Sequence, residues 1–305
     1  GRDINDLGQV TGRSTSVTGF NHAFVGGVQG LTDLGTLGSG VFSGGGGINN
    51  NGVVAGTSLT INQTTPRAFI SGVSGLFDLG ASNFGLNPSS SATGINDSGL
   101  VVGTDGDRAF IGDVNGRIDI GGTEHSSFSR GRAINNAGQI TGEHGIDGQR
   151  HAFIGDVVNG ITDLGTLGGN KSIGLGINDF GQVVGESRFS GGGIREHAFL
   201  YDLIVGMIDI NDLIDPNDEL FGLVTLSDAR DINNSGQIIA NGFLAGGTGD
   251  RLAFILNPIA GTEFVPVSNP EAPSPEGDPN SIPEPMSLAL FLFGAFGLFV
   301  RKQRT

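Results

Sequence analysis

Four acidic residues in the middle of the chain, Asp105, Asp107, Glu124 and Glu143, are the candidates for acid–base chemistry. Most glycoside hydrolases use two carboxylates that flank the scissile bond, one as acid and the other as base or nucleophile. Side chains on loops could supply such a pair at the mouth of a ring of sheets. A secreted carbohydrate-active enzyme is therefore one interpretation, although the sequence does not place the four side chains relative to one another.

Other catalytic and binding motifs are missing. No Gly-x-Ser-x-Gly nucleophile elbow occurs, and the glycine clusters at 44–47 and 191–193 lack the Lys-Ser/Thr ending of a phosphate-binding loop. His125 and His144 lie outside any repeated phrase, and we interpret them as surface residues rather than ligands. The acidic stretch 211–219 does not have the spacing of a calcium loop, which favours a solvated loop. We therefore predict no catalytic residue, no cofactor and no metal site.

The composition indicates a turn-rich protein that does not bind nucleic acid. The chain has 305 residues with 56 Gly, and its 31 acidic residues outnumber 16 basic ones, for a formal net charge of −15. A surface that follows phosphates needs clustered Lys and Arg. Without Cys there is neither a disulfide framework nor a thiolate metal site. Because the chain starts at Gly1 and not at Met, we expect a precursor that extends upstream.

One phrase recurs six times: Ile-Asn, two loop residues, Gly and then a short β-branched run. Successive copies are 44, 47, 39, 43 and 55 residues apart, the range of one supersecondary unit in a repeat protein. A unit of about 40 residues cannot bury enough apolar surface alone, so neighbouring copies must share a core. The copies begin at Ile4, Ile48, Ile95, Ile134, Ile177 and Ile232.

Each copy is predicted to contain four short strands. The Ile-Asn phrase reads as strand, tight turn and strand, because Asn, Asp and Gly suit short hairpins. A third strand contains Ala-Phe, whose Phe is the best candidate for the core between neighbouring units, and a fourth contains Asp-Leu-Gly or a relative. The Phe residues are Phe24, Phe69, Phe110, Phe153, Phe199 and Phe254.

Four strands at this period describe the blade of a β-propeller. There are six Ile-Asn and six Ala-Phe phrases but only five Asp-Leu-Gly strands, so one closing strand is missing. We expect it upstream of Gly1, where it would close the ring against the last blade. The prediction is an all-β propeller of about six four-stranded blades, and further upstream copies would raise that number. A β-solenoid is the alternative, although solenoid coils repeat at shorter periods.

A basic residue precedes Ala-Phe wherever an Asp-Leu-Gly or related strand follows. The two charges are 11 or 12 residues apart, nearly opposite on adjacent strands, where opposite charges stabilise pairing by roughly 0.2–1 kcal/mol. Because Asp is a poor strand former, its recurrence implies a partner. We predict five structural ion pairs: His22 with Asp33, Arg67 with Asp78, Arg108 with Asp119, His151 with Asp163, and His197 with Asp209.

The tail after the repeats has a different composition. Seven Pro between residues 262 and 285 predict an extended spacer. Residues 286–300 carry no charge and precede a basic end; as a helix of ~22 Å they could make a marginal membrane crossing with that end in the cytoplasm. We predict a propeller over residues 1–260, a disordered spacer over 261–281 and a hydrophobic helix within 282–305.

The order of Pro-Glu-Pro, apolar run and basic terminus resembles the PEP-CTERM sorting signal of Gram-negative bacteria. The resemblance implies processing by an exosortase, a membrane enzyme, after transient anchoring in the inner membrane. A plain C-terminal membrane anchor is the alternative. The signal residues would be Pro283, Glu284, Pro285, Arg301, Lys302 and Arg304.

The repeats themselves resemble the bacterial extracellular HAF-repeat family. The resemblance rests on His-Ala-Phe, on Thr-Asp-Leu-Gly-Thr-Leu-Gly-Gly at 162–169 and on Gly-Ile-Asn-Asp-x-Gly-Gln-Val-Val-Gly at 176–185. Arg replaces the His in two copies and Leu252 replaces it in the sixth. Membership implies an exported, surface-associated protein without an established catalytic activity.

We therefore expect a non-enzymatic protein of the cell surface or extracellular matrix, which presents its propeller for adhesion or for contact with an exopolysaccharide. The expected partners are an exosortase, the membrane before processing, and an exopolysaccharide. A secreted carbohydrate-active propeller enzyme is the alternative, and paired acids at the ring centre would favour it.

Overall fold

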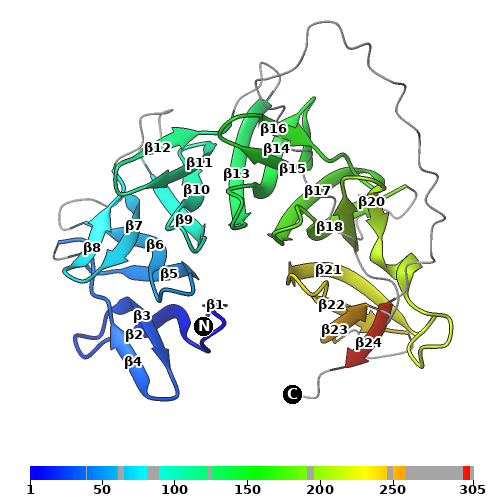
Figure 1. The fold of residues 1–305 in the computed structure, drawn as a ribbon, viewed down its shortest axis with the longest axis horizontal. Coiled ribbons are helices and arrows are strands. Elements are labelled where there is room, and N and C mark those ends of the chain that lie inside the picture. Colours follow the sequence, from blue (N-terminus) through cyan, green and yellow to red (C-terminus); the bar gives the residue numbers. More distant parts are fainter. Residues whose placement is uncertain are drawn as a thin grey trace, which may run out of the picture.

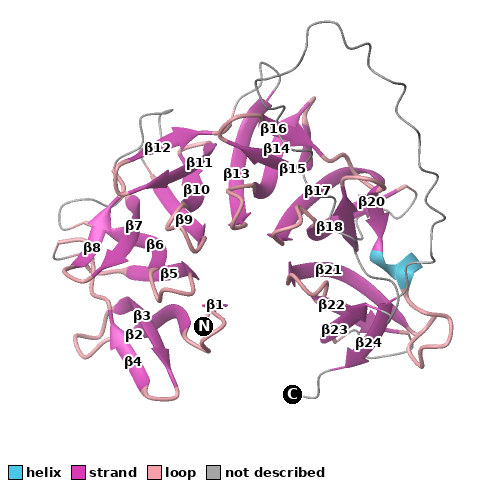
Figure 2. Cartoon of the chain, viewed as in Figure 1, coloured by secondary structure: helices cyan, strands magenta, loops and turns pink. Residues whose placement is uncertain are grey.

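Six four-stranded antiparallel sheets, numbered here 1 to 6 in chain order, make up the described part of the chain. They follow one another round an open arc, with the N-terminal and C-terminal strands on the two sides of the gap (Figure 1), and the regular structure is almost all strand (Figure 2). One parallel bridge, Arg150 to Lys171, links sheets 4 and 5. The computed structural model describes residues 1–38, 40–60, 65–80, 89–121, 126–190, 196–245, 250–258 and 298–302.

Every sheet takes four strands that are consecutive among the described elements. Sheet 1 contains β1 (Asp3–Ile4), β2 (Val10–Thr15), β3 (Asn21–Gly27) and β4 (Gly30–Asp33); sheet 2 contains β5 (Ser43–Ile48), β6 (Val54–Leu59), β7 (Pro66–Gly72) and β8 (Gly75–Asp78); sheet 3 contains β9 (Ser90–Ile95), β10 (Val101–Asp105), β11 (Arg108–Asp113) and β12 (Gly116–Asp119). Sheet 4 contains β13 (Ser126–Ile134), β14 (Ile140–Ile146), β15 (Gln149–Asp156) and β16 (Gly160–Asp163); sheet 5 contains β17 (Gly168–Ile177), β18 (Val183–Phe189), β19 (Glu196–Asp202) and β20 (Gly206–Asp209); sheet 6 contains β21 (Val224–Ile232), β22 (Ile238–Leu244), β23 (Leu252–Pro258) and β24 (Leu298–Lys302). A short 3₁₀ helix, η1 (Ile210–Leu213), joins sheets 5 and 6.

The first strand of each sheet lies on the concave side of the arc and the fourth lies outside (Figure 1). Neighbouring first strands approach closely enough to exclude side chains: a Cβ on Gly47 would lie 2.8 Å from the Cα of Gly94, and one on Gly176 would lie 2.7 Å from the Cα of Asp231. Glycine is required at such positions because it lets two backbones approach. The glycines before Ile-Asn therefore belong to the inner strands.

The hydrophobic core lies between the sheets. Phe69 of sheet 2 shares a buried cluster with Ala23 of sheet 1, and Phe199 of sheet 5 shares one with Ala152 of sheet 4. In sheets 2 to 6 the Phe of the Ala-Phe strand thus packs on the preceding sheet, and in sheets 1 to 5 the Ala faces the following one. Burial of such a ring stabilises the fold by roughly 1.5–3 kcal/mol. Rings exposed by 1% or less are Phe69, Phe110, Phe153, Phe199 and Phe254.

The loop between the first and second strands forms a ladder from sheet to sheet. Asn49 Nδ2 donates to the backbone oxygen of Asn96 in the next sheet at 3.0 Å, while its Oδ1 accepts from the Val53 N–H within its own turn. The Asn of the phrase therefore stabilises its own turn and the neighbouring sheet together. In the described residues the same step links Asn5 to Asn49, Asn49 to Asn96, Asn96 to Asn135, Asn135 to Asn178 and Asn178 to Asn233.

A second ladder uses the residue after each Asn, which is alternately Asp and Asn along the array. The backbone N–H of each donates to the side-chain Oδ1 of the next, at 2.8–3.0 Å. Two hydrogen bonds therefore cross every sheet boundary at the same end of the sheets. The residues are Asp6, Asn50, Asp97, Asn136, Asp179 and Asn234.

The prediction of an all-β fold built from antiparallel sheets is confirmed, and this pairing excludes a solenoid of stacked parallel coils. The expected C-terminal helix is wrong where the structure describes it: Leu298–Lys302 forms strand β24 beside β23. Leu298, Phe299 and Val300 suit a strand, and the free edge of β23 offers unpaired backbone groups. Sheet 6 thus takes its fourth strand from the tail and not from upstream.

The rest of the predicted apolar helix, residues 286–297, and the spacer at 261–281 lie outside the described residues. Across the residues that the structure does describe, no helix has the length and hydrophobicity that a membrane crossing requires.

Candidate functional site

The five predicted ion pairs connect the third and fourth strands of sheets 1 to 5. His22 Nδ1 lies 2.9 Å from Asp33 Oδ2, and Arg67 Nη1 lies 2.8 Å from Asp78 Oδ2. In sheets 3, 4 and 5 the corresponding distances are 3.0, 2.9 and 2.5 Å. The register places each Asp opposite the Phe, for example Asp78 opposite Phe69, so the basic partner is a diagonal neighbour on the same face. The sequence suggested a partner nearly opposite on the adjacent strand, and the structure places it diagonally.

The same Asp residues also stabilise the turn that follows. Asp33 Oδ1 accepts from the Gly35 N–H at 2.8 Å, and Asp78 Oδ1 accepts from the Gly80 N–H at 2.8 Å. A carboxylate has two oxygens, so one Asp can accept from the turn and from the basic residue together. These Asp residues are therefore structural, and a binding site is expected at positions where the copies differ.

The two ends of each sheet differ in how constant they are. One end holds the Ile-Asn ladders, which are the same in every copy. The other, which we call the variable end, holds the turns that join second and third strands. There the residue before His/Arg/Leu-Ala-Phe changes from copy to copy: Asn21, Pro66, Asp107, Arg150, Glu196 and Arg251.

At the variable end of sheet 4, three arginines surround Glu143, which is fully buried; we call this group the arginine cluster. Arg132 Nη2 lies 2.9 Å from Glu143 Oε1, Arg150 Nη1 lies 3.1 Å from Oε2, and Arg130 Nη1 lies 3.6 Å from Oε1. The Arg side chains are 45%, 40% and 41% exposed for Arg130, Arg132 and Arg150. Their guanidinium groups therefore face both a buried carboxylate and the solvent.

Phe128 orients two members of the arginine cluster. The guanidinium carbons of Arg130 and Arg150 lie 5.1 and 5.8 Å from the centre of its ring. A cation held over an aromatic face is stabilised by the charge distribution of the ring. Arg130 and Arg150 are therefore held beside Glu143 by contacts beyond the ion pairs.

A β-bulge places Arg132. In β13, Gly131 pairs with Gly142 and Ala133 pairs with Thr141, so Arg132 is the extra residue between them. In sheet 6, Arg230 is the extra residue between Ala229 and Asp231 in the same way. A bulge turns a side chain out of the regular alternation of a strand. The inner strands of sheets 2 to 6 thus carry a redirected residue two places before the Ile of Ile-Asn, and in sheets 4 and 6 that residue is Arg.

Sheet 6 contains a related group around Asp228, which is 1% exposed. Arg230 and Arg251 contact its two oxygens, and Asn241 donates to Oδ1 at 2.9 Å. Burial by itself would raise the pKa of Asp228, but the hydrogen bonds from Asn241 and Arg251 and the charge of Arg230 hold it below its ordinary value. Asp228 is therefore a buried anion that is kept ionised by its partners.

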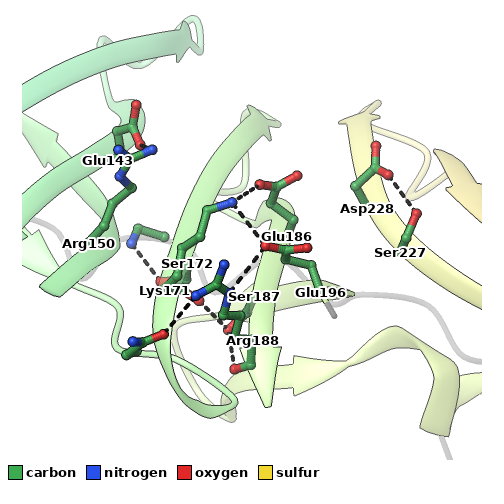
Figure 3. A network of polar contacts seen from close by, with 12 residues as sticks. Glu143, Arg150, Lys171, Ser172, Glu186, Ser187, Arg188, Glu196, Ser227 and Asp228 are labelled. Carbon is green, nitrogen blue, oxygen red and sulfur yellow. Dashed lines mark hydrogen bonds and ion pairs between the residues drawn. The ribbon is translucent and has the colours of Figure 1, made fainter. Parts of the chain in front are cut away.

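Between these two groups, sheet 5 holds a charge-balanced network around Lys171. Lys171 Nζ lies 2.8 Å from Glu186 Oε1 and 3.2 Å from Glu196 Oε1, and Arg188 Nε lies 3.3 Å from the same Glu196 oxygen. Figure 3 shows Glu143 with Arg150, the Lys171 network and Asp228 one after another across sheets 4, 5 and 6. Charged groups thus continue from sheet to sheet at this end.

The interpretation of His144 as a surface residue is wrong. It is 2% exposed, lies opposite His151 on the neighbouring strand and points Nε2 towards Asp163 Oδ1 at 3.5 Å. Burial lowers the pKa of His144 below its ordinary value, and the charge of Asp163 offsets part of that effect. Glu143 and His144 are consecutive in β14, so their side chains point to opposite faces of sheet 4. Both are buried, which means that both faces are covered at this point. His125 lies outside the described residues.

The carboxylates considered for glycoside hydrolysis are not brought together as a free pair in the described residues. Asp105 is buried with Arg117, whose Nη2 lies 3.1 Å from Asp105 Oδ2, and Glu143 is held by the arginine cluster. Asp107 is exposed at a turn, and Glu124 lies outside the described residues. Both buried acids are thus engaged with arginine.

The acidic loop at 211–219 has an apolar base that the sequence did not suggest. Ile210 is fully buried and Ile214 is 4% exposed, and both belong to the core cluster of sheet 6. Its carboxylates bond to their own backbone: Asp215 Oδ1 accepts from the Asn217 N–H and Asp218 Oδ1 accepts from the Leu220 N–H, each at 2.8 Å. Among the residues described, no group of three or more His, Asp or Glu is arranged to hold a metal ion.

Of the predicted sorting residues, Arg301 and Lys302 lie in β24, and Pro283, Glu284, Pro285 and Arg304 lie outside the described residues. The arginine cluster is the feature that sequence reasoning missed. A comparison of the copies at positions outside the shared phrases would have indicated it, since Arg130, Arg132 and Arg150 occupy positions that are uncharged or acidic in several other copies.

Comparisons with known proteins find one kind of match, to solved structures. No protein-family model matches the chain, and no curated protein matches it. Among solved structures, the chain is similar to the TolB protein of Acinetobacter baumannii, with 12% sequence identity and a TM-score of 0.42. The match covers 78% of this chain and spans 61% of that protein.

Proposed function

We propose that this chain is an exported, non-enzymatic repeat module of the cell surface or extracellular matrix whose sheets are the blades of a six-bladed β-propeller with an open seam. Its role is to bind a surface polysaccharide at the variable end. The observation that carries this proposal is the difference between the two ends: the Ile-Asn ladders repeat in every sheet, whereas the charged groups of the variable end change from copy to copy. Repeat proteins commonly bind through the face on which their units differ.

Binding is favoured over hydrolysis by the state of the two buried acids. Asp105 and Glu143 are each buried in an ion pair with arginine, so they do not form a free pair of acids that could flank a glycosidic bond. The half-exposed guanidinium groups beside Glu143 can instead donate hydrogen bonds to a ligand.

Export is supported by the sequence resemblances to the HAF-repeat family and to the PEP-CTERM signal. The tail would anchor the chain transiently in the inner membrane of a Gram-negative bacterium until an exosortase processes it. Replacement of Pro283, Glu284 and Pro285 by Ala should then abolish tail processing, as followed by mass spectrometry of the exported protein. Processing that continues unchanged would refute the sorting part of the proposal.

The binding part is tested separately with immobilised polysaccharides. The chain of residues 1–305 should be retained on at least one bacterial exopolysaccharide in a glycan array and should release no reducing ends from it. Failure to bind any polysaccharide, or release of reducing ends, would refute the binding role.

A further inference from the structure

We propose that the ligand is a carboxylated polysaccharide, bound across sheets 4 to 6 with the arginine cluster as the main site and the Asp228 group as a second site. This inference rests on the proposed function and adds its ligand class and its residues. The two groups carry net charges of +2 and +1, from three arginines against Glu143 and from Arg230 and Arg251 against Asp228. They stand on a chain whose formal net charge is −15.

The arginine cluster has more donors than its own glutamate can use. Three guanidinium groups offer about fifteen N–H donors, whereas one carboxylate offers about four lone-pair sites. Glu143 is fully buried, so it accepts only from the protein side, and each Arg keeps two fifths or more of its side chain exposed. The unused donors are therefore available to a second carboxylate from solution, in the planar geometry that guanidinium prefers.

Sheet 3 forms the same strand pairing without these arginines. Sheet 3 uses Ser91, Thr93 and Thr104 where sheet 4 uses Arg130, Arg132 and Glu143, with Ser91 paired to Thr104 as Arg130 is paired to Glu143. A buried ion cluster is costly to desolvate, and uncharged residues often replace one without loss of stability. Because neighbouring copies fold without the cluster, its presence in sheet 4 points to binding.

The charge distribution favours a polysaccharide over nucleic acid. Double-stranded DNA carries one charge per about 1.7 Å, and the acidic surface of this chain would repel most of that charge. A carboxylated polysaccharide spaces its charges by whole sugar units, so isolated positive groups can be matched one at a time. The groups on sheets 4 and 6 are separated by the balanced Lys171 network, and a chain that reaches both gains avidity from the second contact.

The test uses residues that other copies already place at these positions. The sheet 4 variant is R130S/R132T/E143T/R150N, which introduces the residue types of Ser91, Thr93, Thr104 and Asn21, and it changes the net charge by −2 because three positive charges and one negative charge are removed. The control is R2T/R13T, which removes two exposed positive charges, one next to β1 and one in β2 of sheet 1. The two variants thus have equal net charge. Circular dichroism and thermal melting check that both fold.

The probes are polygalacturonate, neutral dextran and double-stranded DNA, with binding to the chain of residues 1–305 measured at two salt concentrations. We expect the unmodified chain and the control to bind polygalacturonate alike, and the sheet 4 variant to bind about tenfold more weakly or worse, with a shallower salt dependence. The sheet 6 variant D228S/R230T/R251N should lose affinity for the long polymer and less for a trisaccharide of galacturonate.

The outcomes separate this inference from the proposed function. Equal binding by the sheet 4 variant and the control would overturn the assigned site while leaving polysaccharide binding in place. Preference for dextran would overturn the ligand class alone, and tighter binding of DNA than of polygalacturonate would overturn it as well. No binding of any polysaccharide would remove the proposed function and this inference together.

Discussion

Single carboxylates differ in role according to where the fold places them. Asp78 accepts from a turn with one oxygen and from Arg67 with the other, and Asp228 is enclosed by two arginines. Asp231 lies at the concave side of the arc, and no cation is among the groups that shift its pKa. Desolvation raises the pKa of Asp231 to about 6 although part of the residue remains exposed, and the charge of Asp3 in sheet 1 adds to the rise. The seam between the first and last sheets therefore holds two carboxylates that repel each other.

The desolvation of Asp231, together with the charge of Asp3, makes stability depend on pH. The neutral form of Asp231 is favoured by the fold, so ionisation as the pH rises from about 4 to about 6 lowers the free energy of unfolding. D231N keeps an oxygen for the Ile232 N–H but cannot ionise. We expect the variant to be more stable than the unmodified chain at pH 7.5 and equally stable near pH 4, as measured by urea unfolding at both pH values.

Asp113 provides a control of opposite sign. Hydrogen bonds from the backbone and side chain of Asn115 lower the pKa of Asp113, so its ionised form stabilises the fold above the unfolded pKa and loses that effect as the pH falls. D113N should therefore reduce stability more at pH 7.5 than near pH 4. A gain for D231N that is the same at both pH values would contradict the role assigned to its ionisation.

At the scale of the strand, the repeat depends on close packing between a Gly on the second strand and the Phe opposite it on the third strand. Gly185 lies opposite Phe199, and a Cβ there would lie 1.9 Å from the Ile173 oxygen and 2.7 Å from the Phe199 ring. We expect G185A to lower the free energy of unfolding by about 1–3 kcal/mol or more, because neither a backbone oxygen nor a buried ring can move aside freely. Chemical denaturation measures this change.

Sheet 6 supplies the matched comparison, since it already has Ala240 opposite Phe254. A240G should lower the free energy of unfolding by about 1–2 kcal/mol, because it adds backbone freedom to the unfolded chain and removes one buried methyl group. If G185A were as mild as A240G, the close approach of backbone and ring would not be what fixes Gly in the other sheets.

The structural features that could be predicted from the sequence are those that repeat along it. The period, the Ala-Phe core strands and the 11- or 12-residue spacing of charges are visible in one chain because each copy repeats the same local solution. Properties that belong to a single copy were not visible: the bulge that redirects Arg132, the burial of His144 and the pairing of Leu298–Lys302 with β23 all depend on neighbours far away in sequence. The inter-sheet role of the Asn was also missed, because a local turn already accounted for it.

In the whole molecule, the ladders give the array a direction. Each sheet donates from its Asn side chain and accepts at its Asn backbone oxygen, so among the described residues sheet 6 ends with a donor and sheet 1 with an acceptor. Such ends are complementary head to tail, and an interface of this type either closes a ring or joins copies in a line. The open arc of Figure 1 leaves both ends without that partner in the described chain.

Alanine substitutions of one Asn within the ladder and of the Asn at its end test whether the arc stays open. Asn135 donates to Asn178 of the next sheet at 2.9 Å and accepts from the Gln139 N–H, whereas Asn233 has equivalent bonds within its own turn, to Gln237, but no next sheet in the described chain. N135A should therefore lower the free energy of unfolding by about 1–3 kcal/mol, and N233A should cost clearly less. Equal costs would mean that Asn233 has an acceptor in solution. Sedimentation would then show whether it comes from sheet 1 of the same chain, in a monomer, or from a second copy, in a concentration-dependent oligomer.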